Sequence, residues 1–249
     1  VTPAECVALE PALAHCAPEI AGAVHTESEC AADCLKVCTA LARALAQRGV
    51  NFLFDTDVRG VRQAGGRAAA LQTTAGEVEA DAFVVALGAA STRLARTMGV
   101  YLPVYPLKGY SITLDVDPAL GRAPTVNVTD SARKVVFARI GSRLRVAGMA
   151  ELVGHDASIP AGRIETLMDA TRAVFPQCSA FTDPHPWTGM RPATPTAVPI
   201  IGRHARAPAN VLFNTGHGAL GFTLAFGSAL QLSGELHPAR PRELQPAYA

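Results

Sequence analysis

The fold is decided by one stretch, Asn214-Thr215-Gly216-His217-Gly218-Ala219-Leu220-Gly221-Phe222-Thr223. It follows the apolar run Val211-Leu212-Phe213 and opens a further apolar run to Leu236, so the pattern predicts a strand, a glycine turn and a helix. The glycines lack a Cβ atom, which lets a bound group reach the backbone, and the helix start offers unpaired N–H donors. The stretch therefore predicts a helix N-terminus placed against a cofactor, and the alternative is a plain glycine-rich turn.

The same glycines spell G-x-G-x-x-G, the dinucleotide-binding fingerprint. That fingerprint also needs a second parallel strand and an acidic residue about 20 positions later. Here Pro238-Ala239-Arg240-Pro241 follows instead. We therefore do not expect a Rossmann unit at this position.

The composition predicts a globular chain with a sizeable core, since 49% of its 249 residues are hydrophobic. Twenty-two basic side chains balance 21 acidic ones, and the arginines are scattered. This charge gives no electrostatic support for nucleic-acid binding. No apolar stretch approaches the roughly 18 residues of a membrane span. We expect a cytoplasmic protein, or one bound peripherally to the cytoplasmic face of the inner membrane.

The six cysteines do not show the paired spacing of a metal site. Cys30, Cys34 and Cys38 recur every four residues along one helix stripe, where we expect small buried or half-buried core residues. We predict reduced thiols, no disulfide and no metal.

Alternating and continuous apolar patterns predict the remaining elements. A helix is expected over 32–48 and strands over 50–54 and 57–61, followed by two hairpins with turns at Gly65-Gly66 and Ala75-Gly76. The continuous apolar run 81–88 is typical of a strand buried in a parallel sheet. Its last residue, Gly88, is a further candidate for cofactor binding.

The middle of the chain shows a different pattern. Alternation over 110–114, 135–139 and 143–147 predicts an antiparallel sheet, and a helix is expected over 164–175. The proline-rich stretch 184–199 predicts ordered loop and extended chain. We predict an α/β (α+β) fold in which a cofactor-binding layer, residues 25–100 and 189–249, is interrupted by a mostly antiparallel β substrate domain, residues 101–188 together with 1–24.

Three segments contain side chains suited to a small ligand. Arg191 lies between prolines next to the only tryptophan, and a rigid guanidinium can pair with both oxygens of a carboxylate. The alternative is a structural ion pair. Tyr105, Lys108 and Tyr110 lie at the predicted domain boundary, where ligand sites form readily, although aromatic packing explains them as well. His217 lacks the orienting carboxylate of a catalytic triad, so we expect a hydrogen-bonded turn histidine.

Five segments together resemble the FAD-dependent D-amino acid oxidase superfamily, most closely the family of bacterial D-amino acid dehydrogenase small subunits. They are Tyr105-Pro106-Leu107-Lys108-Gly109-Tyr110-Ser111, Arg145-Val146-Ala147-Gly148-Met149-Ala150-Glu151-Leu152, Gly189-Met190-Arg191-Pro192-Ala193-Thr194-Pro195, Pro199-Ile200-Ile201-Gly202 and Gly216-His217-Gly218-Ala219-Leu220-Gly221-Phe222-Thr223. They occur in the family's order.

The resemblance implies a cofactor, FAD, and a set of residues around it. Arg191 matches the position that binds the substrate carboxylate, and Tyr110 and Tyr105 are weaker candidates for substrate contacts. Val58 matches a residue whose backbone meets the adenine region. The flavin-lining turn is matched by Gly218, Ala219, Leu220, Gly221 and Thr223.

The implied reaction is the oxidative deamination of D-amino acids to 2-oxo acids and ammonia. Hydride passes from the substrate Cα to FAD, no protein base acts on the carbon, and the electrons go to a respiratory acceptor such as a quinone. A glycine- or sarcosine-oxidase-like enzyme is the rival within the superfamily. A non-catalytic fragment unable to hold FAD is the rival outside it.

Three departures from the family pattern are visible. The glycine-rich segment that binds the ADP half of FAD is absent from these 249 residues. Thr196-Ala197 stands where Asp-Gly is common, and Phe222 stands where tryptophan is frequent. The first departure leaves open whether this chain binds FAD without that segment.

Overall fold

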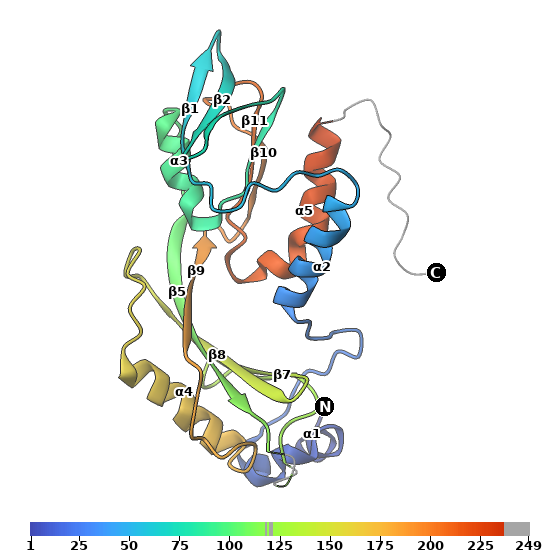
Figure 1. Ribbon diagram of the computed structural model, residues 1–249. Coiled ribbons are helices and arrows are strands. Elements are labelled where there is room, and N and C mark those ends of the chain that lie inside the picture. Colours follow the sequence, from blue (N-terminus) through green and yellow to red (C-terminus); the bar gives the residue numbers. More distant parts are fainter. Residues whose placement is uncertain (118, 120–121, 237–249) are drawn as a thin grey trace. The chain divides into compact units, whose positions relative to one another are not determined.

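Two units are visible in the computed structural model, which describes residues 1–117, 119 and 122–236 (Figure 1). The first combines residues 1–49 with 108–189, and the second combines 50–107 with the described part of 190–249. In this division residues 25–49 group with the first unit, whereas the sequence pattern places the boundary at residue 25. The last 13 residues of the predicted C-terminal segment, 237–249, lie outside the described residues.

The first unit is built around an antiparallel sheet with the strand order β6-β7-β8-β5-β9. Its strands are β5 (Tyr105–Asp115, which begins in the second unit), β6 (Val128–Asp130), β7 (Val135–Ile140), β8 (Arg143–Glu151) and β9 (Trp187–Ala193, which ends in the second unit). The predicted antiparallel sheet is confirmed by the pairing of β5 with β8 and of β7 with β8.

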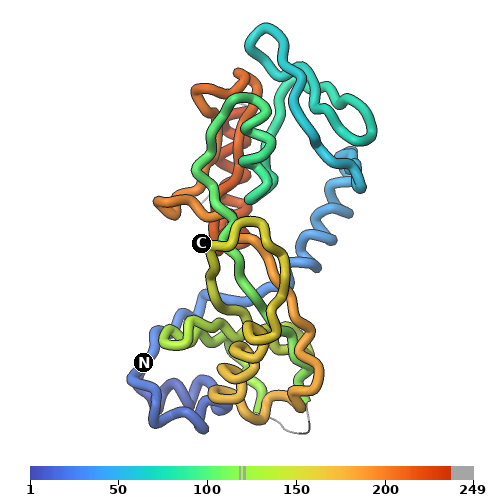
Figure 2. Tube along the Cα trace, turned by 90° about the vertical axis from the view of Figure 1, so that its left-hand side faces the viewer, coloured from blue at the N-terminus to red at the C-terminus, as the bar shows by residue number. Residues whose placement is uncertain are grey.

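Helices of the first unit come from both of its sequence segments. They are α1 (Pro3–Leu9), a 3₁₀ helix η1 (Pro11–Glu19), α2 (Cys34–Ala46) and α4 (Ala161–Val174). Figures 1 and 2 show the dark-blue helix α1 and the yellow helix α4 beside the sheet. Cys6 and Leu13 share one buried cluster with Ile112, Phe137 and Leu167, so the N-terminal helices belong to the core of the sheet domain.

The second unit contains two small sheets. One is the antiparallel meander β1 (Val58–Ala64), β2 (Arg67–Thr73) and β3 (Gly76–Glu79). The other has the order β10-β11-β4 and consists of β10 (Ile200–Arg203), β11 (Val211–Thr215) and β4 (Phe83–Val85). The parallel pairing of β4 with β11 and the helices that follow both strands confirm the predicted α/β character.

Two short 3₁₀ helices and two α-helices follow the parallel strands of this sheet. They are η2 (Gly88–Ala90) and α3 (Ser91–Thr97) after β4, and η3 (Gly218–Leu220) and α5 (Gly221–Leu236) after β11. Phe83, Val85, Leu94, Val211 and Phe213 form the apolar core of the unit. The strand, turn and helix predicted around residues 211–236 are therefore confirmed.

Two expectations from the sequence are wrong. The run 50–54 forms no strand: Phe52 and Phe54 stack on each other at 5.5 Å, and Asp55 adopts a positive φ of 53° that ends extended chain. Cys30, Cys34 and Cys38 are exposed and not core residues. Cys30 precedes α2 and so lies off the expected helix stripe, and α2, which carries Cys34 and Cys38, buries none of its side chains. Helical periodicity identifies an apolar face but not whether another element covers it.

The proline-rich stretch contains a paired strand where loop and extended chain were expected. Pro192 lies inside β9, and β9 is an edge strand of its sheet. An edge strand tolerates proline because its outward N–H has no ladder partner to lose.

Candidate functional site

The predicted cofactor turn lies between β11 and α5. Gly216 and Gly218 have φ values of 81° and 56°, in the left-handed region that favours glycine. A Cβ on Gly216 would also lie 2.7 Å from Thr194 Cγ2, whereas a Cβ on Gly218 would meet nothing within 4 Å. Open space therefore lies beside Gly218, where the sequence predicts a cofactor. Ala219, Leu220 and Thr223 are exposed, and Gly221 is half-buried.

A second glycine turn lies beside the first. Gly88, with a φ of 55°, connects β4 to the helical segment η2 and α3. Because β4 and β11 are parallel, both turns leave the carboxyl edge of the same sheet, which is where α/β proteins bind ligands. The hydroxyl of Thr215 donates to the carbonyl of Gly88 at 2.9 Å. The structure thus brings Gly88 together with the turn at 216–221.

Val58 lines a depression of about 360 Å³ within the second unit. The other lining residues come from the start of β1 and from the segment after β4: Asp57, Arg59, Leu87, Ala90, Arg93 and Leu94. Val58 and two residues close to Gly88, Leu87 and Ala90, therefore border one concave surface, although they are about 30 positions apart in sequence. Arg59 and Arg93 bring positive charge to it, a feature that the sequence analysis missed because the two arginines follow no motif.

The predicted substrate residues lie on β5 and β9. Arg191, on β9, is half-buried, and burial lowers the pKa of its guanidinium. Tyr105, at the start of β5, is 44% exposed. Tyr110, further along β5, is buried, and its hydroxyl donates to Glu151 Oε2 at 2.5 Å. Burial and this hydrogen bond raise the pKa of Tyr110.

Lys108 joins Tyr110 in a network of charged side chains in the first unit. Its side chain is 1% exposed, and Nζ lies 3.2 Å from Asp156 Oδ2. Burial disfavours the charged ammonium, but hydrogen bonds with Tyr110 and Asp156 outweigh it, so the pKa of Lys108 is raised. Glu151 also pairs with Arg163. In this structure the hydroxyl of Tyr110 and the ammonium of Lys108 therefore both bind carboxylates of the chain.

The only tryptophan is held by its neighbours. The Trp187 indole folds over Gly189, where a Cβ would lie 2.1 Å from the ring. The Arg145 guanidinium lies 5.3 Å from the ring centroid and donates to Ser111 Oγ at 2.9 Å. Gly189 is therefore required by the indole, a role that a glycine two residues after a tryptophan in a strand could have indicated.

His217 forms a hydrogen bond within its own unit. Its Nε2 lies 2.8 Å from Ser228 Oγ on α5, and burial lowers the pKa of the imidazole. The expected hydrogen-bonded turn histidine is confirmed.

Two further observations concern what the site can hold. The open backbone at Gly218 fits the approach of a flat cofactor, and Asn214 Oδ1, at the end of β11, is buried without a hydrogen-bond partner among the described residues. The same described residues contain no cluster of three metal-ligating side chains. Of the helices they form, none is long and apolar enough to cross a bilayer.

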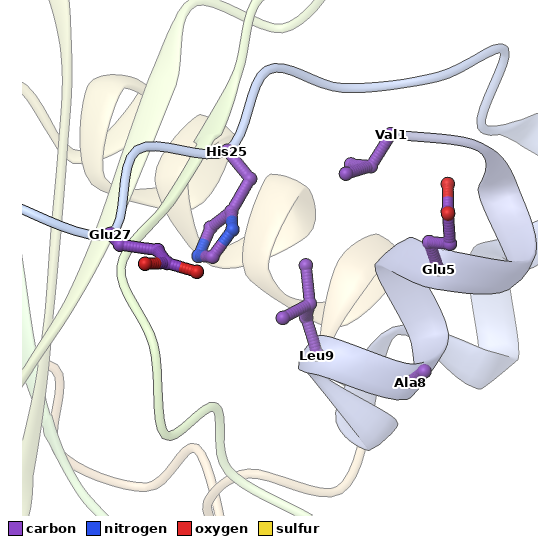
Figure 3. Close-up of a pocket in the computed structure, with 6 residues that line it drawn as sticks. All are labelled: Val1, Glu5, Ala8, Leu9, His25 and Glu27. Atoms are coloured by element: carbon purple, nitrogen blue, oxygen red, sulfur yellow. The ribbon is translucent and has the colours of Figure 1, made fainter.

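A separate pocket of about 350 Å³ lies in the first unit, between α1 and the segment that carries His25 and Glu27 (Figure 3). Val1, Glu5, Ala8 and Leu9 complete its lining. None of the predicted site residues borders it.

Comparison with known proteins gives one consistent family. The family model described as FAD dependent oxidoreductase matches residues 1–234. The D-amino acid dehydrogenase of Paramagnetospirillum magneticum is 40% identical over 240 residues, which cover 96% of this chain and 56% of that relative. D-amino acid dehydrogenase 2 of Ralstonia nicotianae is 46% identical over 234 residues, 90% of this chain and 54% of that relative.

A solved structure shares the fold. Glycine oxidase from Geobacillus kaustophilus superposes with a TM-score of 0.85 at 24% identity, covering 97% of this chain and 63% of that one. The chain spans about half the length of the curated relatives that it matches. Its family model, its identity to these relatives and the two glycine turns agree, and the chain belongs to the FAD dependent oxidoreductase family.

Proposed function

We propose that this chain carries the flavin-facing turns and the substrate carboxylate site of a D-amino acid dehydrogenase. The observation that supports the cofactor site most directly is the pair of glycine turns at the carboxyl edge of β4 and β11, joined by the hydrogen bond from Thr215 to Gly88. The relatives named D-amino acid dehydrogenase, at 40–46% identity, support the substrate class.

FAD, when bound, supplies the acceptor for the hydride that leaves the substrate Cα. In this proposal the open backbone at Gly218 and the N-terminal turn of α5 face the flavin. Val58 and its depression face the adenine region, where Arg59 and Arg93 add positive charge. The chain thus contributes orientation and electrostatics to a redox step that the cofactor performs.

Arg191 binds the substrate carboxylate. An arginine keeps its charge even when burial lowers its pKa, and its planar fork pairs with both carboxylate oxygens. Anchoring the carboxylate fixes the direction of the Cα–H bond, so no protein base on the carbon is needed. Tyr105 and Tyr110 stay weaker candidates for contacts to the substrate.

We further propose that the electrons pass to a respiratory acceptor such as a quinone. A cytoplasmic protein, or one associated peripherally with the inner membrane, would meet such an acceptor. The electron acceptor and the location both go beyond what the names of the relatives say. The rate at which the reduced flavin reacts with oxygen would distinguish this enzyme from a glycine- or sarcosine-oxidase-like one.

The test is a visible absorption spectrum of the purified chain after addition of FAD and removal of the excess, followed by anaerobic addition of D-alanine. We expect a retained flavin spectrum that bleaches. Gly218→Val, which places a branched side chain at a φ of 56°, should abolish flavin retention. If the wild type and this variant retain equal flavin, the turn is not the cofactor site. If neither retains any, this chain is a fragment that cannot hold FAD.

A further inference from the structure

One hydrogen-bond acceptor beside the proposed cofactor turn, the side-chain oxygen of Asn214, makes no hydrogen bond with the described residues. Asn214 Oδ1 is buried and has no hydrogen-bond partner among the residues that the structure describes. Asn214 lies on β11, where it is paired with Ile201 of β10, and it precedes Gly216 by two positions. A buried acceptor left unpaired is costly, and buried polar groups are nearly always bonded in a working protein.

The neighbouring polar side chains already have partners inside the chain. Thr215 Oγ1 donates to the Gly88 carbonyl at 2.9 Å. His217 Nε2 is bonded to Ser228 Oγ at 2.8 Å. Both hydrogen bonds stabilise the turn. Asn214 Oδ1 is the side-chain acceptor next to this turn for which the described residues supply no donor.

A second asparagine, just before the same strand, shows the contrasting case. Asn210 Oδ1 accepts from the Ala68 N–H at 2.8 Å, and its Nδ2 donates to the carbonyls of Ala68 and Asp81 at 2.9 and 3.1 Å. This side chain joins three backbone segments and is fully used by the fold. The two asparagines, four positions apart, therefore provide a matched pair for an experiment.

We propose that Asn214 Oδ1 accepts a hydrogen bond from bound FAD, from a ring N–H or a ribityl hydroxyl. The inference rests on the proposed function, because it uses the same cofactor turn. Its geometric support is the place of Asn214 at the carboxyl end of a parallel strand, next to a turn in which Gly216 and Gly218 have positive φ values. Asn214 is a positioning residue and takes no part in bond breaking.

The experiment compares Asn214→Leu with Asn210→Leu. Both variants replace an asparagine by a leucine of similar shape. The melting temperature of the cofactor-free chain and the Kd of FAD, from quenching of flavin fluorescence, are both measured. Asn214→Leu should keep or raise the melting temperature, since leucine removes an unpaired acceptor, and should weaken FAD binding about 10-fold. Asn210→Leu should lower the melting temperature by roughly 3–10 °C, because it leaves backbone groups unpaired.

Two results would overturn the inference. If Asn214→Leu lowered the melting temperature as much as Asn210→Leu does, Asn214 Oδ1 would have to accept a hydrogen bond within the chain. An unchanged Kd of FAD would mean that the cofactor is not its donor. A wild-type chain that holds no FAD defeats the proposed function at this chain length, and the melting temperatures alone then decide whether Asn214 Oδ1 lacks an internal partner.

Discussion

At the scale of single residues, charged side chains divide into those that the fold uses and those that we assign to a ligand. Lys108 is almost fully buried, yet its charge is balanced by Asp156. Arg191 is half-buried on a strand that contains a proline, and no sequence feature reveals its environment. The two residues therefore call for different measurements.

Replacement of Arg191 tests the carboxylate site. Arg191→Ala should raise the apparent KM for D-alanine about 100-fold while flavin is retained, because a charge-assisted pair of hydrogen bonds is lost. The KM of Arg191→Lys should lie between those of the wild type and Arg191→Ala, because an ammonium lacks the planar fork of a guanidinium. Arg172→Ala, on the exposed side of α4, is the control and should leave KM unchanged. Normal saturation of Arg191→Ala by D-alanine would remove the assignment.

The pH dependence of stability tests the hydrogen bonds that the Asp156 carboxylate accepts from Ser158 and Lys108. Hydrogen bonds from Ser158 and Lys108 lower the pKa of Asp156 from 3.8 to about 2. A lowered folded-state pKa adds stability that is present above pH 3.8 and is lost as the pH falls through about 2. Asp156→Asn should therefore have a lower melting temperature than the wild type at pH 7. The difference between the two melting temperatures should become smaller between pH 4 and pH 2. A gap that is constant with pH would exclude an ionic contribution.

At the scale of elements, β9 combines two requirements in seven residues. The Trp187 indole occupies the space where a side chain on Gly189 would lie, and Pro192 requires a strand at the edge of the sheet. Both are local demands of packing and hydrogen bonding, so the strand tolerates few substitutions at these positions.

Gly189→Ala tests the packing of the indole. The added Cβ would lie 2.1 Å from the ring, so the indole must move away from Arg145. Because Trp187 is the only tryptophan, its fluorescence emission should change directly. Gly162→Ala in α4, where a Cβ meets nothing within 4 Å, should leave the spectrum unchanged. Identical spectra for Gly189→Ala and the wild type would contradict the packing described.

At the scale of the whole molecule, residues far apart in sequence form each unit. Glu10 is 2% exposed and accepts hydrogen bonds from the N–H groups of Thr125 and Val126, more than 100 positions later. Its other oxygen accepts from the Ala12 N–H. The Glu10 carboxylate therefore adds hydrogen bonds to the apolar packing that joins the N-terminal segment to the sheet domain.

Glu10→Ala should destabilise the chain by about 3 kcal/mol, because three backbone N–H groups lose their common buried acceptor together. Glu10→Gln, which keeps an acceptor oxygen, should lose less. Glu29→Ala, an exposed position, serves as the control. Urea unfolding monitored by circular dichroism measures the three variants, and equal midpoints for Glu10→Ala and Glu29→Ala would refute the role of Glu10.

The sequence predicts those parts of the molecule that depend on local patterns. The strand, turn and helix over 211–236, the hairpins and the alternating strands of the first unit follow from periodicity and glycine positions. The exposure of Cys34 and the irregular run 50–54 do not follow, because both depend on which element lies opposite. The same holds for the site. The motif gives Gly218, but only the folded sheet places Gly88 near the same turn and shows that Asn214 Oδ1 has no hydrogen-bond partner among the described residues.

The parallel pairing of Phe83 with Val211 also sets an order of events on the ribosome. All strands of the first unit's sheet are complete once Ala193, the last residue of β9, has been made, so that sheet can close while translation continues. Strand β4, synthesised long before, can pair with β11 only after residue 215 has been made. Of the sheets in the described residues, the one that joins β4, β10 and β11 is therefore the last whose strands are complete.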